Sequence, residues 1–322
     1  MNISRRKKIV FIGTPSVASI FLHELCKNGF KPDFVITQPD KPFGRDKKIL
    51  PPPVKIAAFE HNIQVFQPFD SRDLSKVIKE IKPDIGIIVA YGKLLSKDSL
   101  EYCSTGFFNI HFSFLPSYRG ADPVRWVIIN KEIETGVSIF KVEEKLDSGE
   151  ILVQEKILID KDETSITLLN KLVDKAKKMI INVMPSIISG NFTLFPQKGV
   201  PTYAPKLYLK DTYINFYDSV ENVYARIRAF SYDPYSRFVF LHDGKEYHIQ
   251  IISAQLTNID DSKFSCGRIS GFEKNKGIFV KCLNGSIFLK TIKPQGKKEM
   301  NAYDFFINGI RLKIGDFVYE RK

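Results

Sequence analysis

An amide and an imidazole stand two residues apart in the apolar segment FFNIHFSFLP, residues 107–116. In a β-strand, residues two apart project from the same face, so Asn109 and His111 would lie side by side at the end of this strand. An imidazole moves protons near neutral pH, and an amide can donate a hydrogen bond to an oxygen that becomes negative during acyl transfer. The pair predicts a group-transfer site. The alternative is a strand-end histidine satisfied by the backbone.

A carboxylate that could hold this histidine occurs in the segment KLDSGE, residues 145–150. Asp147, if buried beside His111, would fix the imidazole tautomer or favour its protonated form. The sequence Asp-Ser-Gly also favours a turn in any loop, whether or not the aspartate has a catalytic role. The assignment of Asp147 therefore depends on the neighbouring Asn-His pair.

Two further segments could bind ligands. The expected strand over 84–92 ends in VAYG, and the exposed backbone there could hydrogen-bond a flat heterocycle. The proline-rich segment over 37–55 is long for a loop in a compact domain, and such loops are usually functional or disordered. It carries four basic residues that suit a phosphate backbone, the alternative being a solvated loop: Lys41, Arg45, Lys47 and Lys48.

Composition indicates a globular protein with a polyanionic partner. The 322 residues are 43% hydrophobic and 26% charged, with a net charge of +12. Such an excess favours nucleic acid, although a generally lysine-rich proteome would also produce it. No apolar run reaches the length of a membrane span, and the start does not match a signal peptide. We expect a cytoplasmic protein. The four cysteines form no CxxC pair and the five histidines are scattered, so we expect reduced thiols and no metal site.

The first half alternates apolar strand patterns with amphipathic helix patterns. This predicts an α/β domain over 1–190, with a Rossmann-like, mainly parallel sheet and helices on both faces. Ligands bind at the carboxyl edge of such sheets. The first turn, FIGTPSVAS, does not fit a dinucleotide site, because Pro15 and Val17 stand where glycines are needed. The expected strands are 7–13, 33–38, 63–67, 84–92, 107–113, 135–143 and 150–159, and the expected helices are 16–29, 54–62, 71–82, 121–130 and 164–189.

The second half has a different pattern. Residues 191–207 are proline-rich with little periodicity and are expected to be a linker. Over 208–322, a helix at 218–230 precedes many short strands, then a helix and turn over 305–315 and a strand over 316–320. This predicts a small, basic, OB-like β-barrel that binds nucleic acid. The alternative is a barrel that only packs on its neighbour.

Taken together, these segments resemble the methionyl-tRNA formyltransferase family over the whole length of the chain. The matching segments are VFIGTP, TQPDKPFGRDKK, PPPVK, VFQP, VAYGKLL, NIHFSFLPSYRGADPV, ETGVSI, LDSGEIL, TYAPKL, IRAF and KPQGKK. The chain departs from the family pattern at Phe112, where glycine is common, and at Phe114, where leucine is common. The catalytic polar residues are intact, so these departures concern the shape of the pocket.

The resemblance implies transfer of a formyl group from 10-formyltetrahydrofolate to the α-amino group of methionine on initiator tRNA, for translation initiation. It implies catalysis by Asn109, His111 and Asp147, without a metal. We expect the chain to act as a monomer. The implied tRNA contacts are Arg45 with Lys41, Lys47 and Lys48, and the implied folate contacts are Val89, Ala90, Tyr91, Gly92, Ser113, Phe114, Leu115 and Pro116.

Three other functions, in two classes, are also compatible with the sequence. A formyltetrahydrofolate hydrolase or a sugar-nucleotide formyltransferase would share the Asn-His-Asp domain. The basic loop and barrel argue against both, because neither substrate is a large polyanion. A protein of another class would bind RNA on an α/β scaffold without catalysis. It would keep its RNA affinity without His111 and would bind no folate.

Overall fold

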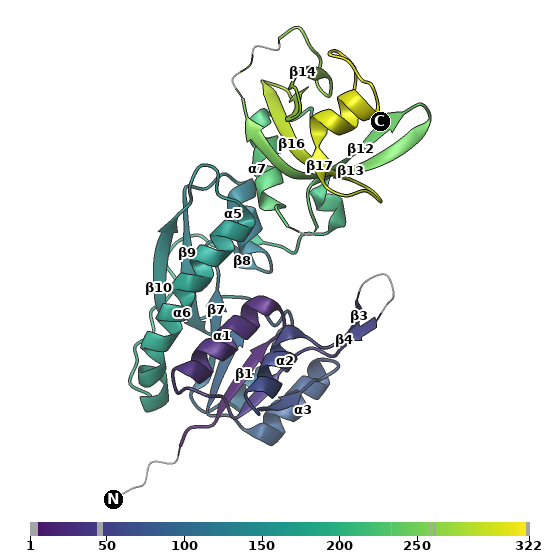
Figure 1. The fold of residues 1–322 in the computed structure, drawn as a ribbon. Coiled ribbons are helices and arrows are strands. Elements are labelled where there is room, and N and C mark those ends of the chain that lie inside the picture. Colours follow the sequence, from purple (N-terminus) through teal and green to yellow (C-terminus); the bar gives the residue numbers. More distant parts are fainter. Residues whose placement is uncertain (1–5, 44–47, 233, 258, 260–261, 320–322) are drawn as a thin grey trace, which may run out of the picture. The chain divides into compact units, whose positions relative to one another are not determined.

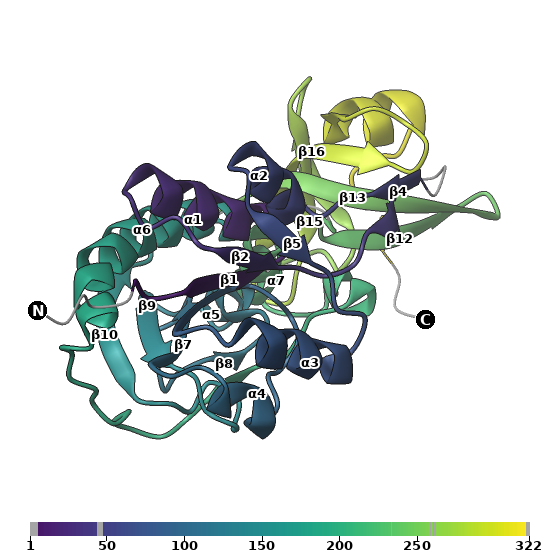
Figure 2. The same cartoon turned by 90° about the horizontal axis from the view of Figure 1, so that it is seen from below.

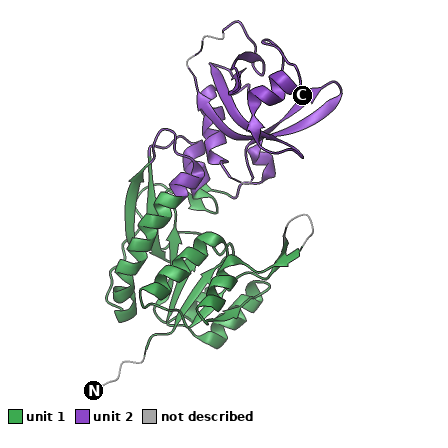
Figure 3. Cartoon of the chain, viewed as in Figure 1, with its two compact units in different colours: residues 1–123, 134–158, 170–205 green, residues 124–133, 159–169, 206–322 purple. Residues whose placement is uncertain are grey.

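The computed structural model describes residues 6–43, 48–232, 234–257, 259 and 262–319. Arg45 and Lys47 of the basic segment lie outside these residues. In the described part of the chain, no helix is long and apolar enough to cross a membrane. The chain divides into two compact units (Figure 3): unit 1 comprises residues 1–123, 134–158 and 170–205, and unit 2 comprises residues 124–133, 159–169 and 206–322.

Unit 1 is built on a seven-stranded sheet, in which β10, β9, β7 and β1 are labelled in Figure 1. The strand order is β10-β9-β7-β6-β1-β2-β5. The five neighbouring strands β7, β6, β1, β2 and β5 run parallel. Strand β9 pairs antiparallel with both β7 and β10. Strands β1 and β6 are apolar and buried along their whole length, as expected for parallel strands covered on both faces. The predicted mainly parallel sheet is thus confirmed. The strands are β1 (Ile9–Gly13), β2 (Phe34–Ile36), β5 (Gln64–Phe66), β6 (Ile85–Val89), β7 (Gly106–His111), β9 (Glu134–Lys141) and β10 (Ile151–Leu158).

Helices cover both faces of this sheet. On one side lie α1 (Ser16–Lys27), α2 (Pro53–Glu60) and α6 (Ser165–Ser189), and on the other lie α3 (Ser71–Ile81) and α4 (Lys97–Glu101) (Figure 2). Helix α3 shows why these segments are helical. The Asp70 side chain accepts hydrogen bonds from two amides of the first turn, and Leu74, Ile78 and Ile81 form one buried face.

The basic segment over 37–55 is not a plain loop. It contains a hairpin in which β3 (Lys41–Phe43) pairs antiparallel with β4 (Lys48–Leu50). At its base, Nζ of Lys55 lies 2.9 and 2.8 Å from the two carboxylate oxygens of Asp40. The expectation of an irregular loop was therefore wrong for these residues, because two short paired strands carry too little periodicity to be read from sequence.

The predicted linker over 191–207 is also corrected, since residues 191–205 belong to unit 1. Strand β11 (Tyr203–Ala204) pairs in parallel with β8 (Arg119–Gly120), and Phe195 forms an antiparallel bridge with Ile151. Prolines and missing periodicity mark an irregular chain. They do not reveal that this chain packs against distant strands.

Unit 2 also takes in two pieces of the predicted first domain, residues 124–133 and 159–169. Within unit 2, the Arg125 guanidinium stacks on the ring of Tyr232 at 4.4 Å, and the hydroxyl of Tyr224 donates to Asp162 at 2.9 Å. These contacts join residues far apart in sequence. The predicted boundary at 190 therefore differs from the observed one.

Most of unit 2 is an antiparallel sheet with the order β12-β13-β16-β15-β14, and β17 pairs with β16. The predicted helix over 305–315 is a short π-helical turn ending at Gly309, and the predicted strand over 316–320 is reduced to one bridge from Phe317 to Arg268. Closure into an OB-like barrel stays a prediction. The elements are β12 (Arg237–His242), β13 (Lys245–Leu256), β14 (Ile269–Glu273), β15 (Gly277–Lys281), β16 (Ser286–Pro294), β17 (Met300–Asn301), α5 (Pro123–Ile129), α7 (Val220–Ala229), a 3₁₀ turn (Leu209–Thr212) and the π-helical turn (Asp304–Gly309).

Candidate active site

The carboxyl ends of β6 and β7 meet at one edge of the sheet in unit 1. The two strands run parallel, and Ile88 pairs with Asn109 in their register. A cavity of about 510 Å³ lies at this edge. Asn109, His111 and Asp147 all line it, so the structure brings the three predicted catalytic residues to one cavity.

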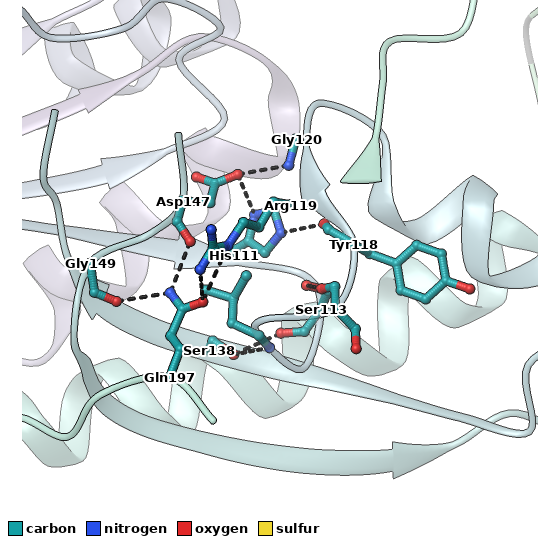
Figure 4. Close-up of polar contacts among 11 residues, drawn as sticks. His111, Ser113, Tyr118, Arg119, Gly120, Ser138, Asp147, Gly149 and Gln197 are labelled. Carbon is teal, nitrogen blue, oxygen red and sulfur yellow. Dashed lines mark hydrogen bonds and ion pairs between the residues drawn. The ribbon is translucent and has the colours of Figure 1, made fainter. Parts of the chain in front are cut away.

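The ring nitrogens of His111 face two different partners (Figure 4). Nε2 lies 2.9 Å from the main-chain oxygen of Tyr118. Because a carbonyl oxygen only accepts, Nε2 carries the proton in this contact. Nδ1 lies 3.8 Å from Oδ2 of Asp147 and is the unprotonated nitrogen of the neutral ring. A proton taken up at Nδ1 would complete an imidazolium held between a carbonyl and a carboxylate.

Asp147 is held in place by both its side chain and its backbone. Its Oδ2 accepts a hydrogen bond from the Gly120 amide at 2.8 Å, and its side chain is only 10% exposed. Its own φ of +47° lies in the left-handed region. Gly120 must be glycine here, because its φ is +126° and an added Cβ would lie 2.6 Å from the Ala204 oxygen.

Gln197 also contacts this turn, although sequence reasoning did not single it out. Its Nε2 donates to the main-chain oxygens of Asp147 and Gly149, both at 2.8 Å (Figure 4). Its Oε1 accepts from the Arg119 guanidinium at 2.6 and 3.3 Å. Gln197 is 50 residues from Asp147 in a segment expected to be a linker, and neither its type nor its spacing marks it.

Of the four folate contacts predicted at the end of β6 and just beyond it, three line the cavity: Ala90, Tyr91 and Gly92. The Tyr91 main-chain oxygen accepts from Nε2 of Gln38 at 2.7 Å, which ties this loop to the start of the basic segment. Burial raises the pKa of the Tyr91 hydroxyl to about 12. Val89 is fully buried within β6 and is not among the described residues that line the cavity.

The segment Ser113–Pro116 was also expected to contact folate, but none of its residues is among those lining this cavity. The Ser113 hydroxyl donates to the Ser117 oxygen at 2.6 Å, and the Leu115 amide donates to Oγ of Ser138 at 3.1 Å. These bonds fix the turn that precedes Tyr118, whose oxygen holds His111. Phe114 and Leu115 instead line a second cavity of about 760 Å³.

The two family departures have different surroundings. Phe112 is nearly buried, lines the first cavity and packs on Phe21 with ring centres 6.2 Å apart. Phe114 packs under Nζ of Lys156, which lies 5.2 Å from its ring centre. Only Phe112 can therefore alter the shape of the first cavity directly.

Lys41 and Lys48, the basic residues that the structure describes in the hairpin, are both exposed. Nζ of Lys41 donates to Oε1 of Gln38 at 2.6 Å. Among the described residues there is no group of three or more His, Cys, Asp or Glu side chains that could hold a metal ion.

Comparisons with known proteins identify the family of this chain. The formyl transferase family model matches residues 7–184, and the model of the formyl transferase C-terminal domain matches residues 206–310. The methionyl-tRNA formyltransferase of Thermosipho melanesiensis is 39% identical over 96% of this chain and 98% of its own length. That of Thermotoga maritima is 35% identical over 98% of this chain and 99% of its own length.

Solved structures share the fold at lower identity. An N-formyltransferase from Helicobacter canadensis, in complex with folinic acid and dTDP-3-aminofucose, has a TM-score of 0.65 and 23% identity, covering 88% of this chain and 99% of that one. A sugar 3N-formyl transferase has the same TM-score and 21% identity, covering 92% of this chain and 100% of that one. The family model and the curated relatives together show that the chain belongs to the formyl transferase family, among the methionyl-tRNA formyltransferases.

Proposed function

We propose that this protein transfers a formyl group from 10-formyltetrahydrofolate to the α-amino group of methionine on initiator tRNA. The observation that carries the proposal is the convergence of Asn109, His111 and Asp147 on one cavity of about 510 Å³. This volume suits a small-molecule site. The relatives that share nearly the whole chain are named for this activity.

The reaction needs no covalent intermediate with the protein. The methionine amine attacks the formyl carbon, a new C–N bond forms, and the bond from that carbon to N10 of the folate breaks. The amine loses one proton and N10 gains one, so the transfer is balanced. Asn109 is the residue proposed to donate a hydrogen bond to the formyl oxygen as it becomes negative.

His111 is proposed to carry the proton between the two nitrogens. Its Nδ1 is the unprotonated nitrogen, because Nε2 donates to the Tyr118 oxygen at 2.9 Å. Once Nδ1 takes the proton from the amine, the Asp147 carboxylate stabilises the positive ring. The ring then returns the proton to N10 of the leaving folate.

The cavity wall supports a folate as formyl donor. Its apolar lining includes Leu95, Phe140 and Val142, which suit the flat ring system of a pterin. The loop Ala90–Gly92 is proposed to present backbone groups to that ring, since Ala90 and Gly92 both have positive φ. We propose that Ser113–Pro116 act indirectly by fixing the Tyr118 turn.

The charge of the chain supports a nucleic acid as acceptor. The net charge is +12, and Lys41 and Lys48 expose basic groups on a hairpin anchored beside the Tyr91 loop. We propose that this hairpin, together with Arg45 and Lys47, contacts the tRNA and that unit 2 provides a further RNA-binding surface. The sugar-nucleotide alternative lacks such a polyanionic partner.

One assay tests the proposal. The protein is mixed with 10-formyltetrahydrofolate and methionine-charged initiator tRNA, and both tetrahydrofolate release and formylmethionine formation are followed. Product formed only with charged initiator tRNA supports the proposal. Equal tetrahydrofolate release without tRNA would identify a hydrolase. Formylation of a dTDP-amino sugar in place of the tRNA would identify a sugar formyltransferase, and no folate turnover would favour a non-catalytic RNA-binding protein.

A further inference from the structure

We infer that Gln197 is a positioning residue for Asp147, so that the segment 191–205 forms part of the catalytic apparatus. The inference rests on the proposed function, because it assigns Gln197 a role in formyl transfer. Gln197 is not expected to touch either substrate. It acts through the turn that carries the Asp147 carboxylate.

The turn around Asp147 has an unusual backbone. A φ of +47° is uncommon for a residue other than glycine and persists only where surrounding contacts impose it. The main-chain oxygens of Asp147 and Gly149, on either side of Ser148, both accept from Nε2 of Gln197 at 2.8 Å. One amide group therefore spans the turn and holds it at two points.

Arg119 determines which end of the Gln197 amide faces the turn. Its guanidinium donates to Oε1 of Gln197 at 2.6 and 3.3 Å. If the amide were rotated by half a turn, its oxygen would face two carbonyl oxygens and its NH₂ group would face a cation. The observed orientation is thus the one in which every polar contact is favourable.

These contacts form a closed ring around Asp147 (Figure 4). Gln197 holds the Asp147 backbone, and Arg119 holds Gln197. The next residue, Gly120, donates its amide to the Asp147 carboxylate at 2.8 Å. Strand β8, which contains Arg119 and Gly120, also pairs with β11 at the end of the same segment. The backbone and the carboxylate of Asp147 are therefore fixed to one element.

This closed set of contacts matters because the Asp147 carboxylate must be able to hydrogen-bond His111 when the imidazole is protonated. Oδ2 of Asp147 lies 3.8 Å from Nδ1 of His111, whereas a charge-assisted hydrogen bond is about 2.7–2.9 Å long. A small movement of the carboxylate towards Nδ1 completes this hydrogen bond when the imidazole is protonated. A turn that was free to shift would not hold the carboxylate close enough to form the bond. Loss of such an outer contact typically lowers activity about 10- to 100-fold where it orients a metal ligand, and we expect a similar loss here.

The test compares three variants in the formyl-transfer assay. Gln197→Ala should lower kcat about 10- to 100-fold while KM for both substrates stays within about threefold. Gln197→Glu keeps the length and an acceptor for Arg119 but removes both donors, so it should lose as much. Gln64→Ala, which changes an exposed glutamine on β5, is the matched control and should behave as wild type.

A double-mutant comparison shows whether Gln197 acts through Asp147. In an Asp147→Asn background, adding Gln197→Ala should change kcat by less than about threefold, because the charge that it positions is already absent. Independent losses that multiply would overturn the inference. So would a wild-type kcat in Gln197→Ala.

Hydrogen exchange of the Gly120 amide gives a readout that needs no activity. This amide donates to the Asp147 carboxylate, so Gln197→Ala should speed its exchange at least several-fold, and Gln64→Ala should not. If wild-type protein forms no formylmethionyl-tRNA, the proposed function fails. The Gly120 exchange rate then decides by itself whether Gln197 positions Asp147, and an unchanged rate would overturn that role.

Discussion

Replacing Asp147 by asparagine removes one charge and leaves the shape of the turn unchanged. The amide oxygen introduced by Asp147→Asn can still accept the Gly120 amide, which donates at 2.8 Å in the native protein. The bond from Gln197 to residue 147 is made to the main chain and is unaffected. The substitution therefore tests the charge that faces His111, with the backbone held constant.

The size of the effect follows from the geometry of the pair. Nδ1 of His111 and Oδ2 of Asp147 are 3.8 Å apart, and their side chains are 6% and 10% exposed, so water screens the pair weakly. Opposite unit charges at this separation attract by about 4 kcal/mol at an effective dielectric constant near 20. Each 1.36 kcal/mol changes a rate by about tenfold. If the ring is fully charged in the transition state, kcat should fall by up to about a thousandfold.

The assay measures initial rates of formylmethionyl-tRNA formation at saturating concentrations of both substrates. Asp174→Asn, at an exposed position on α6, is the matched control and should leave kcat unchanged. Thermal unfolding of both variants establishes that the fold is intact. A kcat for Asp147→Asn within about threefold of wild type would refute the reasoning, because the carboxylate would then not stabilise a charged His111.

Three further perturbations test other parts of the structure. Asn109→Ala should lower the single-turnover rate constant of formyl transfer about 10²- to 10³-fold, because the donor to the formyl oxygen is lost. An unchanged rate constant would exclude that role. Gly120→Ala should lower the free energy of unfolding, measured in urea, by about 1–3 kcal/mol, because the added Cβ would clash with the Ala204 oxygen. Gly29→Ala is the control, since Gly29 also has a positive φ but open space around it, and it should lower the free energy of unfolding by less. Equal losses in the two variants would contradict the clash. Burial raises the pKa of Cys103, Tyr91 and Tyr224 from 9.0, 10.0 and 10.0 to about 12 each. The folded state thus holds these protons more tightly than the unfolded chain, so urea midpoints should fall as pH rises from about 9 towards 12, and Tyr91→Phe should weaken that fall. Midpoints that stay constant from pH 8 to 11 would contradict this assignment.

The amino-acid sequence by itself determined the candidate catalytic residues and the class of the first sheet. Asn109 and His111 could be paired because a strand has a period of two, and the apolar run marks where that strand ends. The alternation of buried strands and amphipathic helices was enough to predict a mainly parallel sheet. Local periodicity encodes these features, so they can be recognised without knowing which segments meet.

The tertiary structure alone decided what surrounds those residues. The Tyr118 oxygen selects the His111 tautomer, and the Gly120 amide binds the Asp147 carboxylate. Gln197 spans the turn from a segment that was predicted to be a linker. Likewise, Phe114 and Leu115, which the resemblance implies as folate contacts, line a second cavity of unit 1. They do not line the cavity that contains His111. Each of these contacts joins an irregular segment to another part of the chain. Irregular segments carry no period from which a partner could be predicted, and only the packing of the folded chain brings the two together.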